Sequence, residues 1–160
     1  MPKALAKKND AVDLLDADHV AVKKLFNDYK KLCNADAPSE EKLGIAEQIC
    51  QELTVHAQIE EEIFYPQLRD AIDDDFLFDE AEVEHGTAKD LIAQISGMSP
   101  EDDLYDARVT VLGEYIDHHV KEEREEIFVK ARKSKLDLVF MADELSQRKM
   151  ELMEEYKSEA

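Results

Sequence analysis

The chain of 160 residues carries 20 Lys and Arg against 39 Asp and Glu, which gives a formal net charge of −19 and a sequence pI near 4.5. This length suffices for one domain with a real core, and the 44% hydrophobic content argues against disorder. Such acidity argues against nucleic acid and anionic membrane surfaces as partners. No apolar run approaches the ~20 residues that a membrane span needs.

The N-terminus is basic but lacks the continuous apolar stretch and cleavage site of a secretory signal. The two cysteines, Cys33 and Cys50, do not make a disulfide framework. We therefore expect them to be small buried or boundary residues in a reducing cytoplasm.

Apolar residues recur with helical spacing in five stretches, and no segment alternates as a strand would. The first predicted helix covers about residues 10–32, with Asp10 or Asp13 as its cap. The second covers about residues 39–64, with Ser39 as the predicted cap.

Pro66 lacks a backbone donor and should kink or break the second helix, with a short piece continuing to Ile72. The third helix covers about residues 76–95. An acidic turn precedes it and places negative charge near its N-terminus, where the helix dipole makes such charge stabilising. The sequence Ser99–Pro100–Glu101 predicts a cap, a proline at the first helical position and an acidic first turn. The fourth helix then extends from there to about Ala131.

An amphipathic segment at about residues 135–157 is predicted to form an additional C-terminal helix that covers the bundle or a partner. Short connections join neighbouring helices in antiparallel order. The predicted fold is thus all-α, an up-down antiparallel four-helix bundle at about residues 10–131 with this added helix, all within a single domain of residues 1–160.

Four of the five histidines fall on the apolar stripes, one on each helix of the bundle, and two of them are followed four residues later by a glutamate on the same stripe. The six residues are His19, His56, Glu60, His85, His119 and Glu123. A carboxylate in an apolar core costs several kcal/mol unless it is paired or bound to a metal. Counting at ~1.5 Å per residue places His19 and His56 at the same height. His85 and His119 match less well, and the match improves if the fourth helix begins near Asp103.

A weak internal repeat relates the two helix pairs, since each contributes one histidine and one His-x-x-x-Glu motif. This arrangement indicates two adjacent metals bridged by carboxylates, with two nitrogens and two oxygens for each ion. Imidazole with carboxylate fits iron, manganese or zinc. With a bridging hydroxide, each ion keeps an open position for dioxygen, nitric oxide or peroxide.

These motifs resemble the hemerythrin-like HHE cation-binding domains over about residues 10–131. The matching segments are Asp18-His19-Val20, the stretch from His56 to Pro66, Glu84-His85, and the stretch from His118 to Phe128. The resemblance implies two non-heme iron ions with an oxo or hydroxo bridge, held by the six residues above. Oxygen-carrying hemerythrins have a His-x-x-x-His pair on the third helix, whereas this chain has Lys89 after His85. The chain therefore resembles the broader HHE group, whose roles include sensing, nitric oxide handling and stress response.

Several assignments stay open at this point. His118 with Glu122 could replace His119 with Glu123, although His118 lies on the flank of the stripe. Glu61 could replace Glu60 as the bridge, although Glu61 and Glu62 read as a solvated face. The tyrosines that could donate to a bound oxygen species are Tyr29, Tyr65 and Tyr115.

Three classes of function are compatible with this reading. The leading one is a metal-binding protein that binds dioxygen or a related small molecule for sensing, storage or stress response. The second is a di-iron enzyme, peroxide-decomposing or ferroxidase-like, although the histidine-rich ligand set favours binding over oxygen activation. The third is an interaction module in which metal occupancy controls docking through the C-terminal helix.

Overall fold

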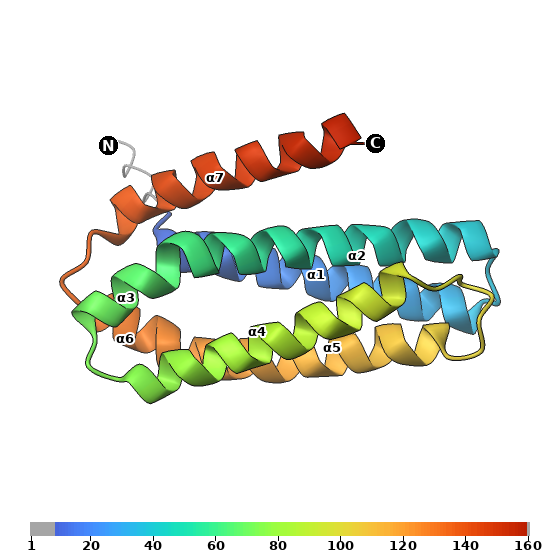
Figure 1. The fold of residues 1–160 in the computed structure, drawn as a ribbon, viewed down its shortest axis with the longest axis horizontal. Coiled ribbons are helices and arrows are strands. Elements are labelled where there is room, and N and C mark those ends of the chain that lie inside the picture. Colours follow the sequence, from blue (N-terminus) through green and yellow to red (C-terminus); the bar gives the residue numbers. More distant parts are fainter. Residues whose placement is uncertain (1–8, 160) are drawn as a thin grey trace, which may run out of the picture.

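The computed structural model describes residues 9–159, and every regular element in that range is helical (Figure 1). The four long helices of the bundle are α1 (Ala11–Asn34), α2 (Ser39–Ile59), α4 (Asp75–Ser96) and α5 (Tyr105–Glu122). The added C-terminal helix is α7 (Leu138–Glu159). The predicted all-α bundle with an extra helix is confirmed.

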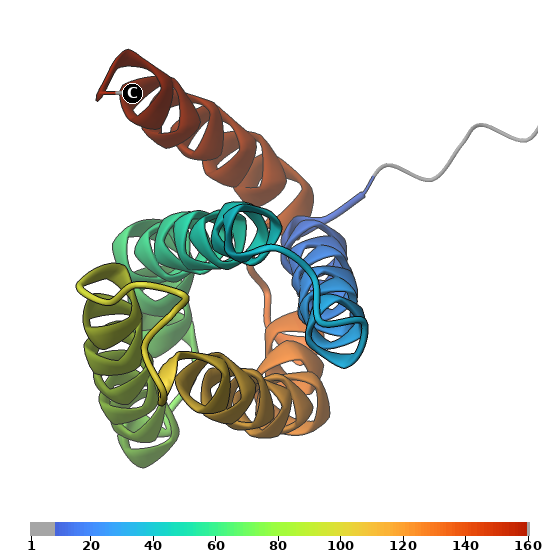
Figure 2. The ribbon, with the colours of Figure 1, turned by 90° about the vertical axis from the view of Figure 1, so that its right-hand side faces the viewer.

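Seen end-on, the four long helices surround one core, and α7 lies outside this ring against α1 and α2 (Figure 2). Its apolar side chains Met141, Leu145 and Leu152 are buried there. The C-terminal helix therefore covers the bundle itself along these two helices.

Local hydrogen bonds explain where α1 begins. The Asp10 side chain accepts from the backbone of Asp13, and the Asp13 side chain accepts from the backbone of Asp10. This reciprocal capping box satisfies two backbone donors that the first turn of a helix leaves free. Both of the predicted capping residues thus take part, with Asp10 as the cap.

The cap predicted for the second helix is wrong by one residue. Ser39 is the first helical residue of α2 and makes no side-chain capping bond. The carbonyl of Pro38 already accepts from the backbone of Glu41 and Lys42, so the helix starts one position earlier than a serine cap would allow. The extended conformation of Pro38 sets this start.

The start predicted for the fourth helix is also wrong, because Ser99 does not cap it. Ser99 and Asp102 instead close a separate turn, in which the Asp102 side chain accepts from the Ser99 backbone at 2.9 Å. The chain remains in turns until α5 begins at Tyr105, whose side chain is buried. Because α5 begins later than predicted, His85 and His119 lie at the same height in the bundle. Counting residues from position 99 would place them at different heights.

Pro66 does not end the second helix. The helical path widens upstream into a π-helical segment, η1 (Glu60–Phe64), and continues as α3 (Tyr65–Ala71), with the proline in its first turn. The fourth helix does the same through η2 (Glu123–Ile127) into α6 (Phe128–Lys133). Each π-helical segment begins at one of the two predicted ligand glutamates. Such segments inside α-helices are frequent at functional sites.

Two apolar clusters fill the bundle, one toward each end. One includes Phe64, Phe78 and Phe128, and the other includes Ile49 and Tyr105. The polar layer of predicted ligands lies between these clusters, so it is closed off above and below by apolar side chains.

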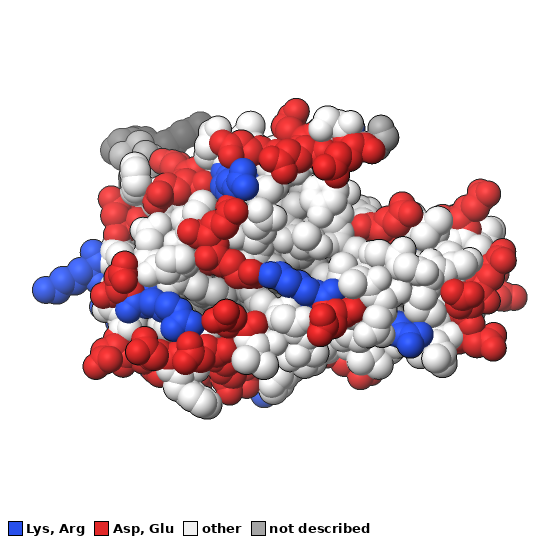
Figure 3. Space-filling model, viewed as in Figure 1, with Lys and Arg blue, Asp and Glu red and all other residues white. Residues whose placement is uncertain are grey.

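The surface shown in Figure 3 is strongly acidic, with only scattered lysines and arginines. Within the described range, no helix combines the length and apolar character needed to cross a membrane. Cys33 and Cys50 are both free thiols, the first half-buried and the second buried, as predicted.

Candidate metal centre

The structure brings all six predicted ligands together in the middle of the bundle. Each of the six residues is at least nine-tenths buried, and Glu60 and Glu123 are fully buried. The ligand atoms form two overlapping groups, and the atoms of each group all lie within 4.8 Å of one another. The first group is His19, His56, Glu60 and Glu123, and the second is Glu60, His85 and His119. The histidine rings pair across the helices, with centroids 4.9 Å apart for His19 and His56 and 5.0 Å apart for His85 and His119.

Each glutamate spans both histidine pairs. Glu60 Oε1 lies 3.2 Å from His56 Nε2 and 3.3 Å from His85 Nε2. Glu123 Oε1 lies 3.1 Å from His19 Nε2, and its Oε2 lies 3.4 Å from His119 Nε2. Each carboxylate therefore lies between the two histidine pairs.

The inner atoms are poorly satisfied by the protein itself. Among the described residues, six buried side-chain atoms lack a hydrogen-bond partner, and all of them belong to the predicted ligands: Nε2 of His19, His56 and His119, both carboxylate oxygens of Glu60, and Oε1 of Glu123. Buried polar groups without partners are costly and need an explanation. A pair of divalent cations would satisfy all of them, so the residues present fit the metal that the donor set suggests.

The outward nitrogens of the four rings are, by contrast, all engaged. Each Nδ1 lies at hydrogen-bond distance from a carboxylate. The pairs are His19 with Asp16 at 3.2 Å, His56 with Asp18 at 2.9 Å, His85 with Glu61 at 2.9 Å, and His119 with Glu84 at 3.0 Å. A carboxylate can only accept, so Nδ1 carries the proton and Nε2 faces the centre. Metal-binding histidines are oriented in this way by a carboxylate or carbonyl behind them.

Three of these outer carboxylates are held in turn by a basic side chain. Asp16 accepts from Arg124 at 2.6 Å, Asp18 accepts from Lys149 at 2.6 Å, and Glu61 accepts from Lys89 at 2.5 Å. Lys149 belongs to α7, so the C-terminal helix reaches the layer behind the ligands. Lys89, four residues after His85, supports that histidine through Glu61.

The same contacts shift the pKa values of the inner groups in the metal-free protein. Burial favours the neutral form of His56, but Glu60 and Asp18 outweigh it and raise its pKa to about 10. For His119 burial is likewise outweighed, by Glu123 and Glu84, and the pKa rises to about 11. Burial would raise the pKa of Glu123, but the neighbouring His119 and His19 hold it well below its usual range.

Tyr65 places a phenol beside the centre. Its hydroxyl donates to Glu123 Oε2 and lies 3.4 Å from His85 Nε2. The side chain is buried, and burial together with Glu123 and Glu60 raises the pKa of the phenol well above its usual value. The hydroxyl therefore keeps its proton at neutral pH.

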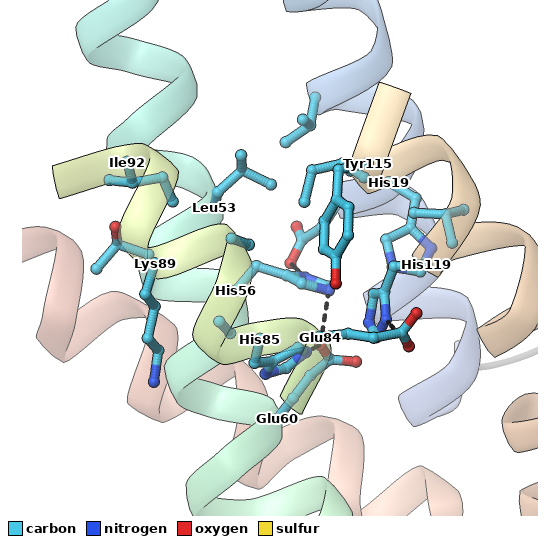
Figure 4. A pocket seen from close by; sticks show the side chains of 17 residues that line it. His19, Leu53, His56, Glu60, Glu84, His85, Lys89, Ile92, Tyr115 and His119 are labelled. Carbon is cyan, nitrogen blue, oxygen red and sulfur yellow. Dashed lines mark hydrogen bonds and ion pairs between the residues drawn. The ribbon is translucent and has the colours of Figure 1, made fainter. Parts of the chain in front are cut away.

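A cavity of about 40 Å³ adjoins the histidines on the side of the apolar cluster that includes Ile49 and Tyr105 (Figure 4). Its walls are mostly apolar and include Val22, Leu53, Ile92 and Ile116, and Tyr115 lies over the ligands in this view. This volume exceeds the ~10–15 Å³ that one water molecule needs. It suits a ligand of two or three heavy atoms.

The structure separates the alternatives that spacing leaves open. His119 points into the centre, whereas the His118 side chain is 62% exposed. Glu60 lies in the centre, and Glu61 stands behind His85 rather than on a purely solvated face. Tyr29 donates to Asp106 in the apolar cluster beyond the cavity, away from the ligands.

The sequence analysis did not predict that the outer carboxylates orient the histidine rings. Asp16, Asp18 and Glu84 flank the histidines closely in the sequence, which is the signal they offer. That signal is weak in a chain with 39 acidic residues.

Comparison with known proteins places this geometry in context. A family model described as the hemerythrin HHE cation-binding domain matches residues 10–131. A DNA nickase from Nostoc sp. is 32% identical over 123 residues, which cover 75% of this chain and 33% of that protein. The chain thus spans about a third of the length of the curated relative it matches.

A solved structure has a similar fold. It is a hemerythrin HHE cation-binding domain-containing protein from Mycobacterium kansasii, with a TM-score of 0.75 and 21% identity, and the match covers 90% of this chain and 87% of that one. At this identity the likeness concerns the fold.

Proposed function

The chain belongs to the hemerythrin HHE cation-binding domain family, and from that premise we propose that it binds two non-heme iron ions in the buried layer and, through them, a small ligand such as dioxygen, nitric oxide or peroxide. The observation that carries the proposal is the set of unpartnered inner atoms, all of which belong to the six converging ligands. Manganese and zinc fit the same donors less specifically.

The side chains divide the work between holding and orienting. His19 and His56 would hold one ion, His85 and His119 the other, and the glutamates of the two π-helical segments would join them. The carboxylates behind the rings fix Nε2 toward the centre before any ion arrives. When bound, iron supplies open coordination positions that accept small oxygen- or nitrogen-containing ligands, with an oxo or hydroxo bridge as the further expectation.

The cavity supports a small ligand in particular. Its apolar walls offer few hydrogen-bond partners for a polar organic substrate, and about 40 Å³ admits only a very small molecule. This favours sensing, storage or stress response over turnover of a larger metabolite.

Tyr65 favours a second candidate function, that of a peroxide-decomposing or ferroxidase-like enzyme. Its phenol keeps a proton beside Glu123 and His85, two of the predicted ligands. Slow peroxide decay with the iron-loaded protein would exclude this candidate. Fast decay that Tyr65→Phe abolishes without loss of iron would establish it.

The activity named for the nickase is not carried over, since that protein is about three times as long as the matched segment. The net charge of −19 and the acidic surface oppose binding to a polyanion. We propose that this chain binds no nucleic acid itself.

The test is anaerobic reconstitution with ferrous iron, followed by metal quantitation and an optical spectrum titrated with oxygen. We expect about two iron ions per chain and near-ultraviolet bands that change with oxygen. His56→Ala should lower the iron content sharply, whereas His118→Ala on the exposed face should lower it less. Equal iron in the wild type and His56→Ala would overturn the proposal.

A further inference from the structure

A second His-x-x-x-Glu pair lies on α5, one residue before the buried pair. His118 Nε2 is 3.2 Å from Glu122 Oε1 and 3.8 Å from Glu84 Oε2, and Glu84 comes from the neighbouring helix α4. One ligand atom from each of these three side chains lies within 4.8 Å of the others. Neither of these two His118 contacts has hydrogen-bond geometry.

The charges around Glu84 differ from those around the other outer carboxylates. Asp16, Asp18 and Glu61 each accept a hydrogen bond from an arginine or a lysine. Within residues 9–159, Glu84 has no such basic partner and instead faces His118 and a second carboxylate, that of Glu122. The Glu84 side chain is only 12% exposed, so water screens its charge poorly.

We propose that His118, Glu122 and Glu84 form an outer site for a divalent transition-metal cation, separate from the buried pair. One imidazole nitrogen and two carboxylate oxygens suit zinc, manganese or ferrous iron. The exposed His118 and the half-buried Glu122 leave room for water to complete the coordination. The cation neutralises the charge of Glu84, as a lysine or an arginine does for each of the other three outer carboxylates.

Glu84 connects the outer site to the buried centre. Its Oε1 accepts from His119 Nδ1, while its Oε2 faces the outer site. A cation on Oε2 therefore fixes the carboxylate that orients a predicted inner ligand. The outer site itself needs no ion in the buried centre, so the proposal stands or falls independently of the di-iron assignment.

The experiment measures zinc binding to the full chain by equilibrium dialysis and metal analysis, before and after a short exposure to a chelator. We expect the wild type to bind one zinc ion more per chain than Glu122→Gln, and the chelator to remove this ion first because it is exposed. The matched control is Glu125→Gln, which removes the same charge from an exposed position nearby on η2. The control should bind as many ions as the wild type.

The ring nitrogens of His118 give a second readout. Their nuclear magnetic resonance shifts should change on zinc addition in the wild type and in Glu125→Gln, but not in Glu122→Gln. Equal zinc content in the wild type and Glu122→Gln overturns the outer site and leaves the buried centre untouched. A wild type that binds only the chelator-labile ion supports the outer site, and the iron reconstitution described above then tests the buried centre separately.

Discussion

Asp18 offers a sharp test of the layer behind the ligands. Its carboxylate lies 2.9 Å from His56 Nδ1 and 2.6 Å from Lys149 Nζ, and its side chain is only 10% exposed. Asp18→Asn keeps the size and shape of the side chain but removes the charge that orients the imidazole. The inner ligands are all retained, so any loss of metal affinity comes from this one contact.

The expected loss follows from the role of such partners. Replacing a carboxylate behind a metal-binding histidine typically weakens metal binding by about 10–100-fold, which corresponds to about 1.4–2.8 kcal/mol. The control is Asp28→Asn on the same helix, whose carboxylate pairs with Lys24 at 3.0 Å on the surface. An exposed pair of that kind contributes less than about 1 kcal/mol and touches no predicted ligand.

The assay is anaerobic competition for ferrous iron between the protein and a chromophoric chelator, with circular dichroism to confirm that each variant is folded. Asp18→Asn should lose affinity, and Asp28→Asn should match the wild type. If Asp18→Asn binds iron as tightly as the wild type while His56→Ala does not, the carboxylate plays no part in orienting the ring.

Five further outcomes follow from the geometry. The metal-free protein holds a proton on His56 with a pKa of about 10, so metal affinity should rise with pH below that value, with proton release in weakly buffered solution. The raised pKa stabilises the metal-free fold fully below about 6.5, and this contribution should be lost as pH rises toward 10, as urea unfolding at several pH values would show. Gly113→Ala, whose Cβ would lie 2.9 Å from a ring carbon of Phe26, should lower the free energy of unfolding by about 1–2 kcal/mol. Gly86→Ala, with open space around it, should raise that free energy by about 0.5–1 kcal/mol. Leu145→Ala, at the fully buried contact of α7, should lower it by about 2–4 kcal/mol, and an unchanged denaturation midpoint would show that this helix is not docked.

Helical periodicity was sufficient to predict the inner layer. His56 and Glu60 lie on one apolar stripe, one turn apart, and burial of both follows from that spacing alone. The neighbour pair His118 and Glu122 has the same spacing, but its position on the flank of the stripe assigns it to the surface. Residue types and a period of 3.6 thus suffice to choose between the two pairs.

Features that depend on contacts between helices were not predictable. Glu61 reads as a surface residue in the sequence, and only the approach of α4 places it behind His85. The π-helical segments at Glu60 and Glu123 have no recognisable sequence signal, although they decide how the chain continues past each glutamate. The start of α5 depends on a turn closed by Asp102, which competes with the serine–proline start signal.

The hydrogen bonds that hold all four imidazole rings from behind have a kinetic consequence. Folding alone fixes the directions of the rings, so little conformational entropy remains to be lost when an ion enters. The rate of loading should then be governed by the path through the apolar wall and by the departure of protons, and hardly by rearrangement of the backbone. A centre assembled in advance in this way can change its occupancy or its charge with small displacements of the helices around it.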